Sequence, residues 1–501
     1  MPTLAVCSLA AAVSLSAAFS DQYSSWSSVE ASPGCLLEPA ASANANYVAI
    51  MECLASPGRT ARLQPGVYLL TKGITLLPDS QIEGVATDPR DFARLQIETP
   101  TSMTSFVLET SNNSSASFLT LDAANYLVGS GCCVSVVRVS GNNSLLHDLE
   151  LLSVRGGTGA YFIDTLATGN LLQRVHVRDC FYGVIFGSGL DSEHPNRFED
   201  GTVEGIACDA IVLVGYGEAV RNTVRHSGFA CGGQPPSPAS GLYCRGNSAG
   251  GLVAENTVHD TCGMALDFDS CANFNASFNS FRDPGNTFTG QYPFCAGAST
   301  ATLLDSSDCH VEGNVVANDR SSNVQALAAL KDPNHVFHDK DTAAFSDLPG
   351  GADTVLNFVV VQRPWTNAGS SVSNKVIRNV FRSTCNGTSS SCVGVGYYSG
   401  RGTGLRGATE WAPTHFIANA VAGSDVGSRR CGRNWYSSDV LCPVGAAAPC
   451  NEDDHEHRKD HFRNDPDCGH YSHYFPWEEV YGGMGPLRVP LPLRPERHAR
   501  S

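Results

Sequence analysis

Short segments with one pattern of polar and hydrophobic residues recur along the chain. Each begins with Asn, continues with two small or hydrophobic residues and usually ends with a polar residue. The six segments occupy positions 222–225, 256–259, 279–282, 314–317, 379–382 and 419–422. Second hydrophobic runs, often opening with Gly, lie between them, for example at 183–186, 210–213, 241–244 and 264–267. Short runs of this kind predict β-strands that repeat along the chain.

The spacing of the segments predicts a solenoid. The shortest interval, from position 256 to position 279, is 23 residues, which suits one coil of a parallel β-helix. Such coils stack at about 4.8 Å, so equivalent residues form columns and an Asn at each corner can bond the backbone of neighbouring turns. A β-sandwich would instead require tight two-residue turns and polar/apolar alternation, which are less evident. We therefore predict an all-β fold, a right-handed single-stranded parallel β-helix with an N-terminal helical cap and a disulfide-tied C-terminal extension.

Composition agrees with a strand-and-turn protein. The 501 residues include 42% hydrophobic but only 16% charged residues, and 49 are Gly. A solenoid can accommodate this length in one domain. The net charge of -16 argues against a protein whose whole surface binds nucleic acid or anionic membrane. We expect no nucleic-acid partner, no membrane insertion of the mature chain, and a monomer.

The N-terminal part carries a family resemblance. Residues 45–54 read as a short helix, and Pro65-Gly-Val-Tyr68 opens a strand soon after it. This arrangement is similar to the first module of the pectin-lyase-like superfamily, in which a short helix caps the first coil. The resemblance covers roughly residues 40–425 and implies the β-helix fold. It leaves activity open, because the superfamily includes lyases, hydrolases, epimerases and non-catalytic adhesion proteins.

Motifs of two member families are missing or altered. The Asn-Thr-Asp, Asp-Asp and Gly-His-Gly motifs of polygalacturonases are absent from the predicted solenoid, so that activity is disfavoured. The Asp-Pro-His motif of alginate C5-epimerases is replaced by Asp332-Pro-Asn-His335, with one residue inserted. No epimerase residue is therefore carried over to this chain.

Several features predict secretion. Residues 4–19 are apolar and uncharged, which is typical of a signal peptide, although no Lys or Arg precedes them. Of the 19 Cys, 18 lie beyond this segment, and glycosylation sequons begin at Asn112, Asn113, Asn142, Asn275 and Asn386. Cys180, Cys208, Cys231 and Cys262 each follow a repeated strand, so we expect a column that contains either disulfides between coils or buried thiols.

We predict four regions. They are a signal peptide at 1–20, an N-terminal segment with cap and first coil at 21–85, the β-helix at 86–425, and a Cys/His-rich extension at 426–501. Two stretches, 283–297 and 320–351, are longer than a coil turn requires. Long insertions in a regular scaffold often carry or cover a binding site.

Alignment of the coils places a set of mostly charged residues in one column, directly after an interior residue. The set is Arg178, Glu204, Arg225, His259, Arg282, Ala317 and Arg382. Successive cations at coil spacing suit an anionic polymer. His259 or Arg282 is the candidate base or acid, and Arg178, Arg225 and Arg382 are candidates for holding substrate carboxylates. A solvated polar face neutralised by acids such as Asp179, Asp260 and Asp283 is the alternative.

A second constellation lies in the segment Leu266-Asp-Phe-Asp269. Strand alternation points Asp267 and Asp269 outward, with Asp305 on the next coil and Tyr243 and Arg245 on the preceding one. The two carboxylates are candidates for catalysis, and with Asp305 for binding Ca²⁺ beneath a uronate; Tyr243 and Arg245 are candidates for substrate binding. Carboxylates at strand ends with no catalytic role are the alternative.

Together these features predict a secreted protein acting on an extracellular acidic polysaccharide. The leading hypothesis is a lyase or C5-epimerase, because we expect the charged column to cross the face of Asp267 and Asp269. Both activities begin with removal of the proton at C5 of a uronate. The alternatives are a non-catalytic binding or surface protein and a glycoside hydrolase that uses paired Asp. Ca²⁺ is the cofactor we expect, and the sequence indicates no other. A cluster of His, Asp and Cys between positions 451 and 474 is interpreted as a flexible charged tail.

Overall fold

The computed structural model describes the chain from residue 34 to residue 441, with gaps. The described ranges are 34–98, 106–124, 134–152, 157–162, 167–187, 193–228, 239–245, 249–261, 263–269, 271–283, 301–304, 306–318, 355–362, 374–383, 392–399, 415–417, 419–422, 435–436 and 440–441. The predicted signal peptide and almost all of the predicted C-terminal extension lie outside these ranges. Within them, no helix is long and apolar enough to cross a membrane.

The first coils form from short strands and one helix. The elements are β1 (Cys35–Leu37), α2 (Ala43–Cys53), β2 (Thr60–Leu63), β3 (Val67–Leu70), β4 (Ile74–Thr75), β5 (Gln81–Gly84), a 3-10 turn (Pro89–Asp91), β6 (Ala93–Ile97), β7 (Phe106–Glu109), β8 (Ser115–Asp122), β9 (Ser135–Val139) and β10 (Leu145–Leu152). Ser42 caps α2, and a disulfide from Cys35 to Cys53 ties β1 to the end of the helix. The predicted helical cap is confirmed.

From residue 158 onward, each coil contributes three strands, which we call A1, A2 and B. The A1 strands are β12 (Leu171–Gln173), β15 (Asn196–Glu199), β18 (Gly217–Val220), β21 (Gly251–Ala254), β24 (Phe274–Ser277), β27 (His310–Glu312), β30 (Lys375–Ile377) and β33 (His415–Ile417). The A2 strands are β13 (His176–Arg178), β16 (Thr202–Ile206), β19 (Thr223–Ser227), β22 (Thr257–Thr261), β25 (Ser280–Asp283), β28 (Val315–Asn318), β31 (Val380–Ser383) and β34 (Asn419–Ala422). The B strands are β11 (Thr158–Phe162), β14 (Tyr182–Phe186), β17 (Ile211–Leu213), β20 (Leu242–Arg245), β23 (Leu266–Asp269), β26 (Ala301–Leu304), β29 (Val355–Gln362) and β32 (Cys392–Ser399).

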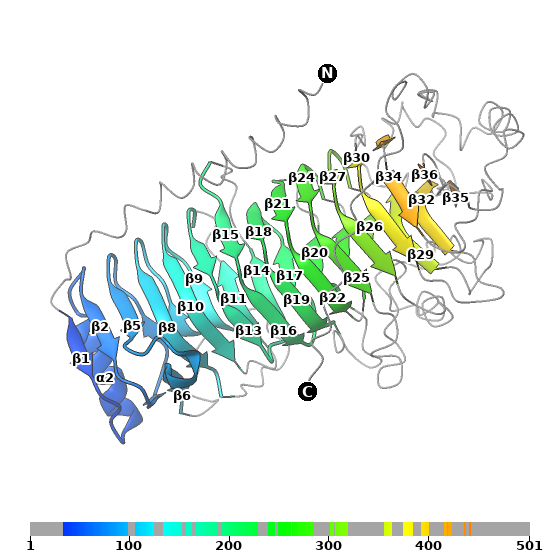
Figure 1. Cartoon of the computed structure of the whole chain (residues 1–501). Coiled ribbons are helices and arrows are strands. Elements are labelled where there is room, and N and C mark those ends of the chain that lie inside the picture. Colours follow the sequence, from blue (N-terminus) through cyan, green and yellow to red (C-terminus); the bar gives the residue numbers. More distant parts are fainter. Residues whose placement is uncertain are drawn as a thin grey trace, which may run out of the picture. The chain divides into compact units, whose positions relative to one another are not determined.

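Each strand pairs in parallel with the equivalent strand of the next coil, so successive coils lie side by side (Figure 1). The A1 and A2 strands belong to one sheet of 24 strands, because the long strands β8 and β10 span both positions. The B strands form a second sheet of 12 strands, which β35 (Trp435–Tyr436) ends by antiparallel pairing, and β36 (Val440–Leu441) pairs with β34. Parallel crossovers of this kind are right-handed. The predicted fold, a right-handed parallel β-helix, is confirmed.

Interior residues form continuous columns between the sheets. The A2 strands contribute Val177, Val203, Val224, Val258, Phe281, Val316 and Phe381, each at most 1% exposed. On the B side, the rings of Phe162 and Phe186 stack with centroids 4.8 Å apart. Burial of one such side chain stabilises the fold by about 1.5–3 kcal/mol, so the columns are the main source of stability.

A ladder of buried Asn side chains links the coils at the bend between A1 and A2. The Oδ1 of Asn256 accepts a hydrogen bond from the backbone amide of Asn222 at 2.8 Å, and its Nδ2 donates to the carbonyl of Ala219 at 2.8 Å. The same contacts recur at Asn279, Asn314 and Asn379. The predicted corner role of Asn is therefore confirmed for these residues, while the Asn419 side chain lies outside the described residues.

The residue before each ladder Asn has a positive φ, which turns the chain from A1 into A2. The residues at these positions include Arg221, Glu255, Phe278, Gly313 and Arg378. Only two residues form the bend, so no turn signal in the sequence separates A1 from A2. This is why the sequence analysis found two strands per coil where the structure has three.

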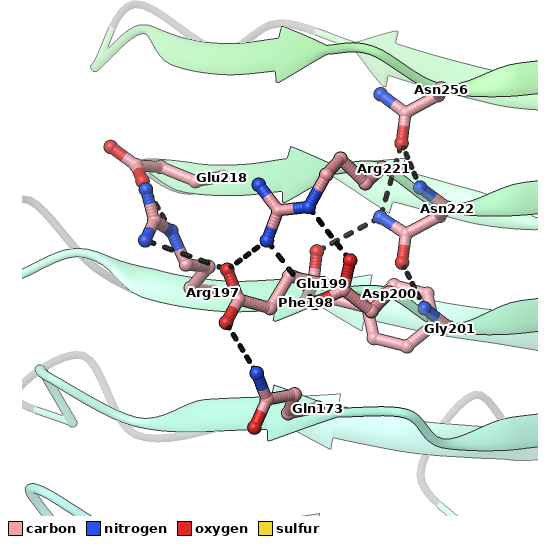
Figure 2. Close-up of polar contacts among 10 residues, drawn as sticks. All are labelled: Gln173, Arg197, Phe198, Glu199, Asp200, Gly201, Glu218, Arg221, Asn222 and Asn256. Atoms are coloured by element: carbon pink, nitrogen blue, oxygen red, sulfur yellow. Dashed lines mark hydrogen bonds and ion pairs between the residues drawn. The ribbon is translucent and has the colours of Figure 1, made fainter. Parts of the chain in front are cut away.

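Ion pairs reinforce the same bend on its outer side (Figure 2). Arg221 binds both carboxylate oxygens of Asp200, at 2.7 and 3.1 Å, and Glu199 at 3.0 Å. Arg197 bonds Glu218 at 2.8 Å. These contacts join side chains of neighbouring coils, so they support the ladder from outside.

The predicted cysteine column contains both bonded and reduced residues. Cys208 is disulfide-bonded, and Cys180 is a buried thiol. Cys231 and Cys262 lie outside the described residues. A disulfide between successive coils does occur, but it joins Cys244 of β20 to Cys271, which follows β23.

Candidate functional site

The predicted charged column exists in the strand register. Arg178 pairs with Glu204, Glu204 with Arg225, Arg225 with His259, and His259 with Arg282. The register continues to Ala317 and Arg382, although the Arg382 side chain lies outside the described residues. We keep the name charged column for these seven positions. The sequence therefore predicted the alignment of the A2 strands correctly.

Acids neutralise the first part of the column. Arg225 Nε lies 2.5 Å from Glu204 Oε2, and His176 Nε2 lies 3.0 Å from Glu204 Oε1. Arg178 pairs with Glu150 at 2.8 Å. Burial acts to raise the pKa of Glu204, but the hydrogen bond from Arg225 and the charges of His176 and Arg225 outweigh it and lower this pKa. This part of the column is thus a charge-balanced network rather than a row of uncompensated cations.

Further along, two imidazoles converge on one carboxylate. His259 Nδ1 lies 2.9 Å from Asp260 Oδ2, and His226 Nε2 of the preceding coil lies 3.7 Å from the same oxygen. The side chains of His226 and His259 are 49% and 32% exposed, whereas that of Asp260 is 18% exposed. A carboxylate in this position orients the imidazole.

Backbone geometry creates this cluster. His226 and Asp260 have φ values of 52° and 56°, as do Asp179 and Gly205 at equivalent positions with 57° and 64°. A positive φ inside a strand interrupts the alternation of faces, so two consecutive side chains point outward. Strict alternation places the residues after Arg225 and His259 inside. The sequence therefore indicated Asp260 only as a neutralising acid and did not indicate His226.

Arg282 extends the cluster by one coil. It is the register partner of His259, and its side chain is exposed. Arg225 is the partner of His259 on the other side. The imidazole of His259 therefore has a guanidinium-bearing neighbour on each adjacent coil.

The Asp267 constellation lies elsewhere. Asp267 and Tyr243 are register partners in the B sheet, while His259 and Arg282 are in the A sheet. The two sheets enclose the core, so their outward faces point in different directions. The expectation that the charged column crosses the face of Asp267 and Asp269 is therefore wrong, because the chain turns a corner between β22 and β23.

Asp267 is also less accessible than expected. It is 8% exposed, and its Oδ2 accepts a hydrogen bond from Ser240 Oγ at 3.4 Å. Alternation gives an outward direction, but an outward residue is solvated only where no other part of the chain covers it. Arg245 and Asp269 are register partners, yet their side chains, like all of Asp305, lie outside the described residues.

Ser240 connects Asp267 to a second buried carboxyl, which the sequence analysis did not identify. The Ser240 amide donates to Asp209 Oδ1 at 2.7 Å. Burial raises the pKa of Asp209 to about 6, despite the opposing hydrogen bond from Ser240. The signal available in the sequence was weak, since Asp209 sits in a turn like many surface Asp residues.

Within the described ranges, no group of three or more His, Cys, Asp or Glu side chains is arranged to hold a metal ion. Of the three predicted Ca²⁺ ligands, only Asp267 has a described side chain. The Ca²⁺ site at Asp267, Asp269 and Asp305 stays a prediction.

The strand pairing defines the class of this protein as a parallel β-helix, which is the fold that the sequence resemblance implied. No family model and no curated protein sequence matches the chain. Among solved structures, it is similar to the A-module of mannuronan C-5 epimerase AlgE6 from Azotobacter vinelandii, with 12% identity over 75% of this chain and 94% of that one and a TM-score of 0.39.

Two further similar structures have comparable scores. The A-module of mannuronan C-5 epimerase AlgE4 from the same organism shares 13% identity over 80% of this chain and 95% of that one, with a TM-score of 0.36. An alginate lyase from Paenibacillus sp. str. FPU-7 shares 12% identity over 79% of this chain and 100% of that one, with a TM-score of 0.29. Likeness at this identity is confined to the fold.

Proposed function

We propose that this chain is a secreted enzyme that acts on an acidic extracellular polysaccharide as a lyase or C5-epimerase, with His259 as the base. The observation that carries the proposal is the cluster of His226, Asp260 and His259, flanked in register by Arg225 and Arg282. It combines a proton acceptor with cations on one outward face, which is what abstraction of a proton beside a carboxylate requires.

The roles follow from the geometry. Asp260 accepts a hydrogen bond from His259 Nδ1, which leaves Nε2 as the nitrogen that takes the C5 proton. The electron pair of the C–H bond moves into the uronate carboxylate, and Arg282 stabilises the added charge. In a lyase, the C4–O4 bond then breaks and the leaving oxygen takes a proton; in an epimerase, a proton returns to the other face of C5.

A non-catalytic binding protein is the second candidate. The ion pairs of Arg225 with Glu204 and of Arg178 with Glu150 favour it, because guanidinium groups already paired with acids contribute to a stable face without catalysis. A glycoside hydrolase would need two accessible carboxyls, and Asp267 is only 8% exposed. Ca²⁺ binding by Asp267, Asp269 and Asp305 is proposed separately, because these residues belong to the B sheet and His259 to the A sheet; the comparison of Ca²⁺ with chelator tests it.

The test uses the full secreted chain and a panel of uronate polysaccharides, with Ca²⁺ or with a chelator. Ultraviolet absorbance detects the unsaturated end that a lyase creates, proton exchange at C5 detects an epimerase, and new reducing ends without absorbance detect a hydrolase. Sequencing of the secreted N-terminus checks the predicted signal peptide. Binding to a polymer without any product would establish the non-catalytic alternative.

Substitution of His259 tests whether it is the base. His259→Gln should lower turnover by at least about 100-fold, because general base catalysis contributes roughly that much. His147→Gln is the matched control, since His147 Nδ1 lies 2.7 Å from Asp148 at another bend, where φ is also positive. Full turnover by His259→Gln would rule out its role as the base.

A further inference from the structure

One exposed aromatic ring lies at the bend between β24 and β25. Phe278 is 64% exposed and has a φ of 56°. A bulky side chain is strained in this conformation, which favours Gly, Asn and Asp. The other described residues of the same bend column are mainly charged residues or Gly: Asp148, Arg174, Asp200, Arg221, Glu255, Gly313 and Arg378.

Comparison with Phe118 shows that packing does not offset this strain. Phe118 occupies the same bend in an earlier coil, with a φ of 56°. Its ring contacts Phe92 and His147 edge-on, with centroids 6.1 and 5.5 Å away, so burial compensates for the backbone conformation. Phe278 remains largely in solvent. Strain without a packing benefit is typical of functional positions.

A glycine on the next coil seats the ring. A Cβ atom at Gly313 would lie 2.7 Å from both Cδ1 and Cε1 of Phe278, so the ring rests directly against the Gly313 backbone. Only glycine leaves room for this contact. The ring is thereby held in place while most of it faces solvent.

The surroundings are mixed in polarity. Val315, in the strand that follows Gly313, is 39% exposed. Beside it, Glu312 pairs with Arg378 at 3.4 Å, and their side chains are 28% and 70% exposed. A flat apolar ring with charged and hydrogen-bonding groups at its rim suits a sugar, whose C–H face meets the negative face of an aromatic ring while its hydroxyls meet polar groups.

The ring is continuous with the proposed catalytic face. Phe278 lies in the bend directly before β25, and the outward residues of that strand, Ser280 and Arg282, follow it. Four residues of strand span at most about 13 Å, which a short oligosaccharide bridges. We infer that Phe278 is a stacking platform for a sugar ring of the polysaccharide, a few units from the ring that meets His259 and Arg282. This inference rests on the proposed function.

The test compares Phe278→Asn with the wild-type chain by calorimetric titration with uronate oligosaccharides, and with neutral oligosaccharides, of increasing length. Asn tolerates a positive φ, so the variant should be at least as thermally stable as the wild type. Long oligosaccharides should bind about tenfold more weakly to it, as expected for loss of one aromatic contact, whereas the shortest should bind equally to both. Leu36→Asn is the control, because Leu36 is 60% exposed in β1 and lies outside the proposed face.

The outcomes separate the two proposals. Equal binding of long oligosaccharides to the wild type and to Phe278→Asn, with turnover intact, would overturn the platform alone. Binding of neutral but not acidic oligosaccharides, dependent on Phe278, would support the platform and overturn the acidic substrate. No binding of any oligosaccharide by the wild type would overturn both.

Discussion

The amide of Ser240 donates a hydrogen bond to the carboxyl of Asp209 at a buried position. Ser240 also donates to Asp267, so one residue joins two buried carboxyls that belong to different coils. Because this corner is buried, the protonation of Asp209 affects the stability of the whole solenoid.

We expect Asp209 to make stability depend on pH. Its pKa is about 6 in the folded chain, against about 3.9 in the unfolded chain. Between these pH values the folded chain binds more protons than the unfolded chain. The stabilisation that protonated Asp209 contributes to the fold is therefore full below about pH 4 and is lost as the pH rises to about 6. Asp209→Asn should remove this pH dependence. The difference in free energy of unfolding between the variant and the wild type should therefore shift by about 3 kcal/mol in favour of the variant as the pH rises from about 4 to about 6. Denaturant unfolding at several pH values measures the difference. Parallel curves for the two proteins would contradict the prediction.

Removal of one buried Asn side chain from the ladder should lower the stability of the fold strongly. Asn256→Ala removes the acceptor for the Asn222 amide and the donor to Ala219, and it leaves both groups buried. We expect a loss of about 2–4 kcal/mol in the free energy of unfolding. Asn44→Ala, which alters an exposed Asn of α2, should change it by less than about 0.5 kcal/mol. Similar losses for both variants would argue against the ladder.

Loss of the ion pairs on the outer side of the bend should lower stability less than loss of a ladder Asn. Arg221 makes two bonds to Asp200 and one to Glu199, but its side chain is 43% exposed, so solvent screens these charges. Arg221→Ala should cost about 1 kcal/mol, and Arg221→Lys should recover only part of it because an ammonium lacks the planar fork. Thermal unfolding in low and high salt provides the measurement. A cost that does not shrink in high salt would show that packing, not charge, is responsible.

Cys309 should be unreactive in the folded protein. It is a buried thiol, and burial raises its pKa to about 12, so almost no thiolate exists at pH 8. Alkylation followed by peptide mass analysis should find the Cys309 peptide unmodified in native protein and modified after denaturation. Rapid labelling under native conditions would contradict this placement.

The sequence predicts most of the fold because the ladder Asn marks each coil. Once Asn222, Asn256 and Asn279 are superposed, Arg225, His259 and Arg282 fall into register without further information. The A1 strands are missed because Arg221 and Asn222 alone form the bend that separates them from A2. Local sequence does not reveal a two-residue bend between two strands of similar composition.

The site is less predictable for two physical reasons. A positive φ at Asp260 breaks the alternation on which outward and inward assignments depend; Asp tolerates this conformation, but the presence of Asp alone does not predict the break. Accessibility depends on what other segments cover, which is why Asp267, which alternation points outward, is only 8% exposed. Neither the break in alternation nor the coverage of a side chain by other segments can be predicted from a residue and its sequence neighbours.

The ladder also has a direction. The side chain of Asn256 bonds groups of the coil before it, and its own amide bonds Asn279 of the coil after it. Each corner amide therefore gains its acceptor only when the following coil is present. Every coil thus completes the corner of the coil before it, and a stack that ended at any ladder Asn would leave the amide of that Asn without its acceptor.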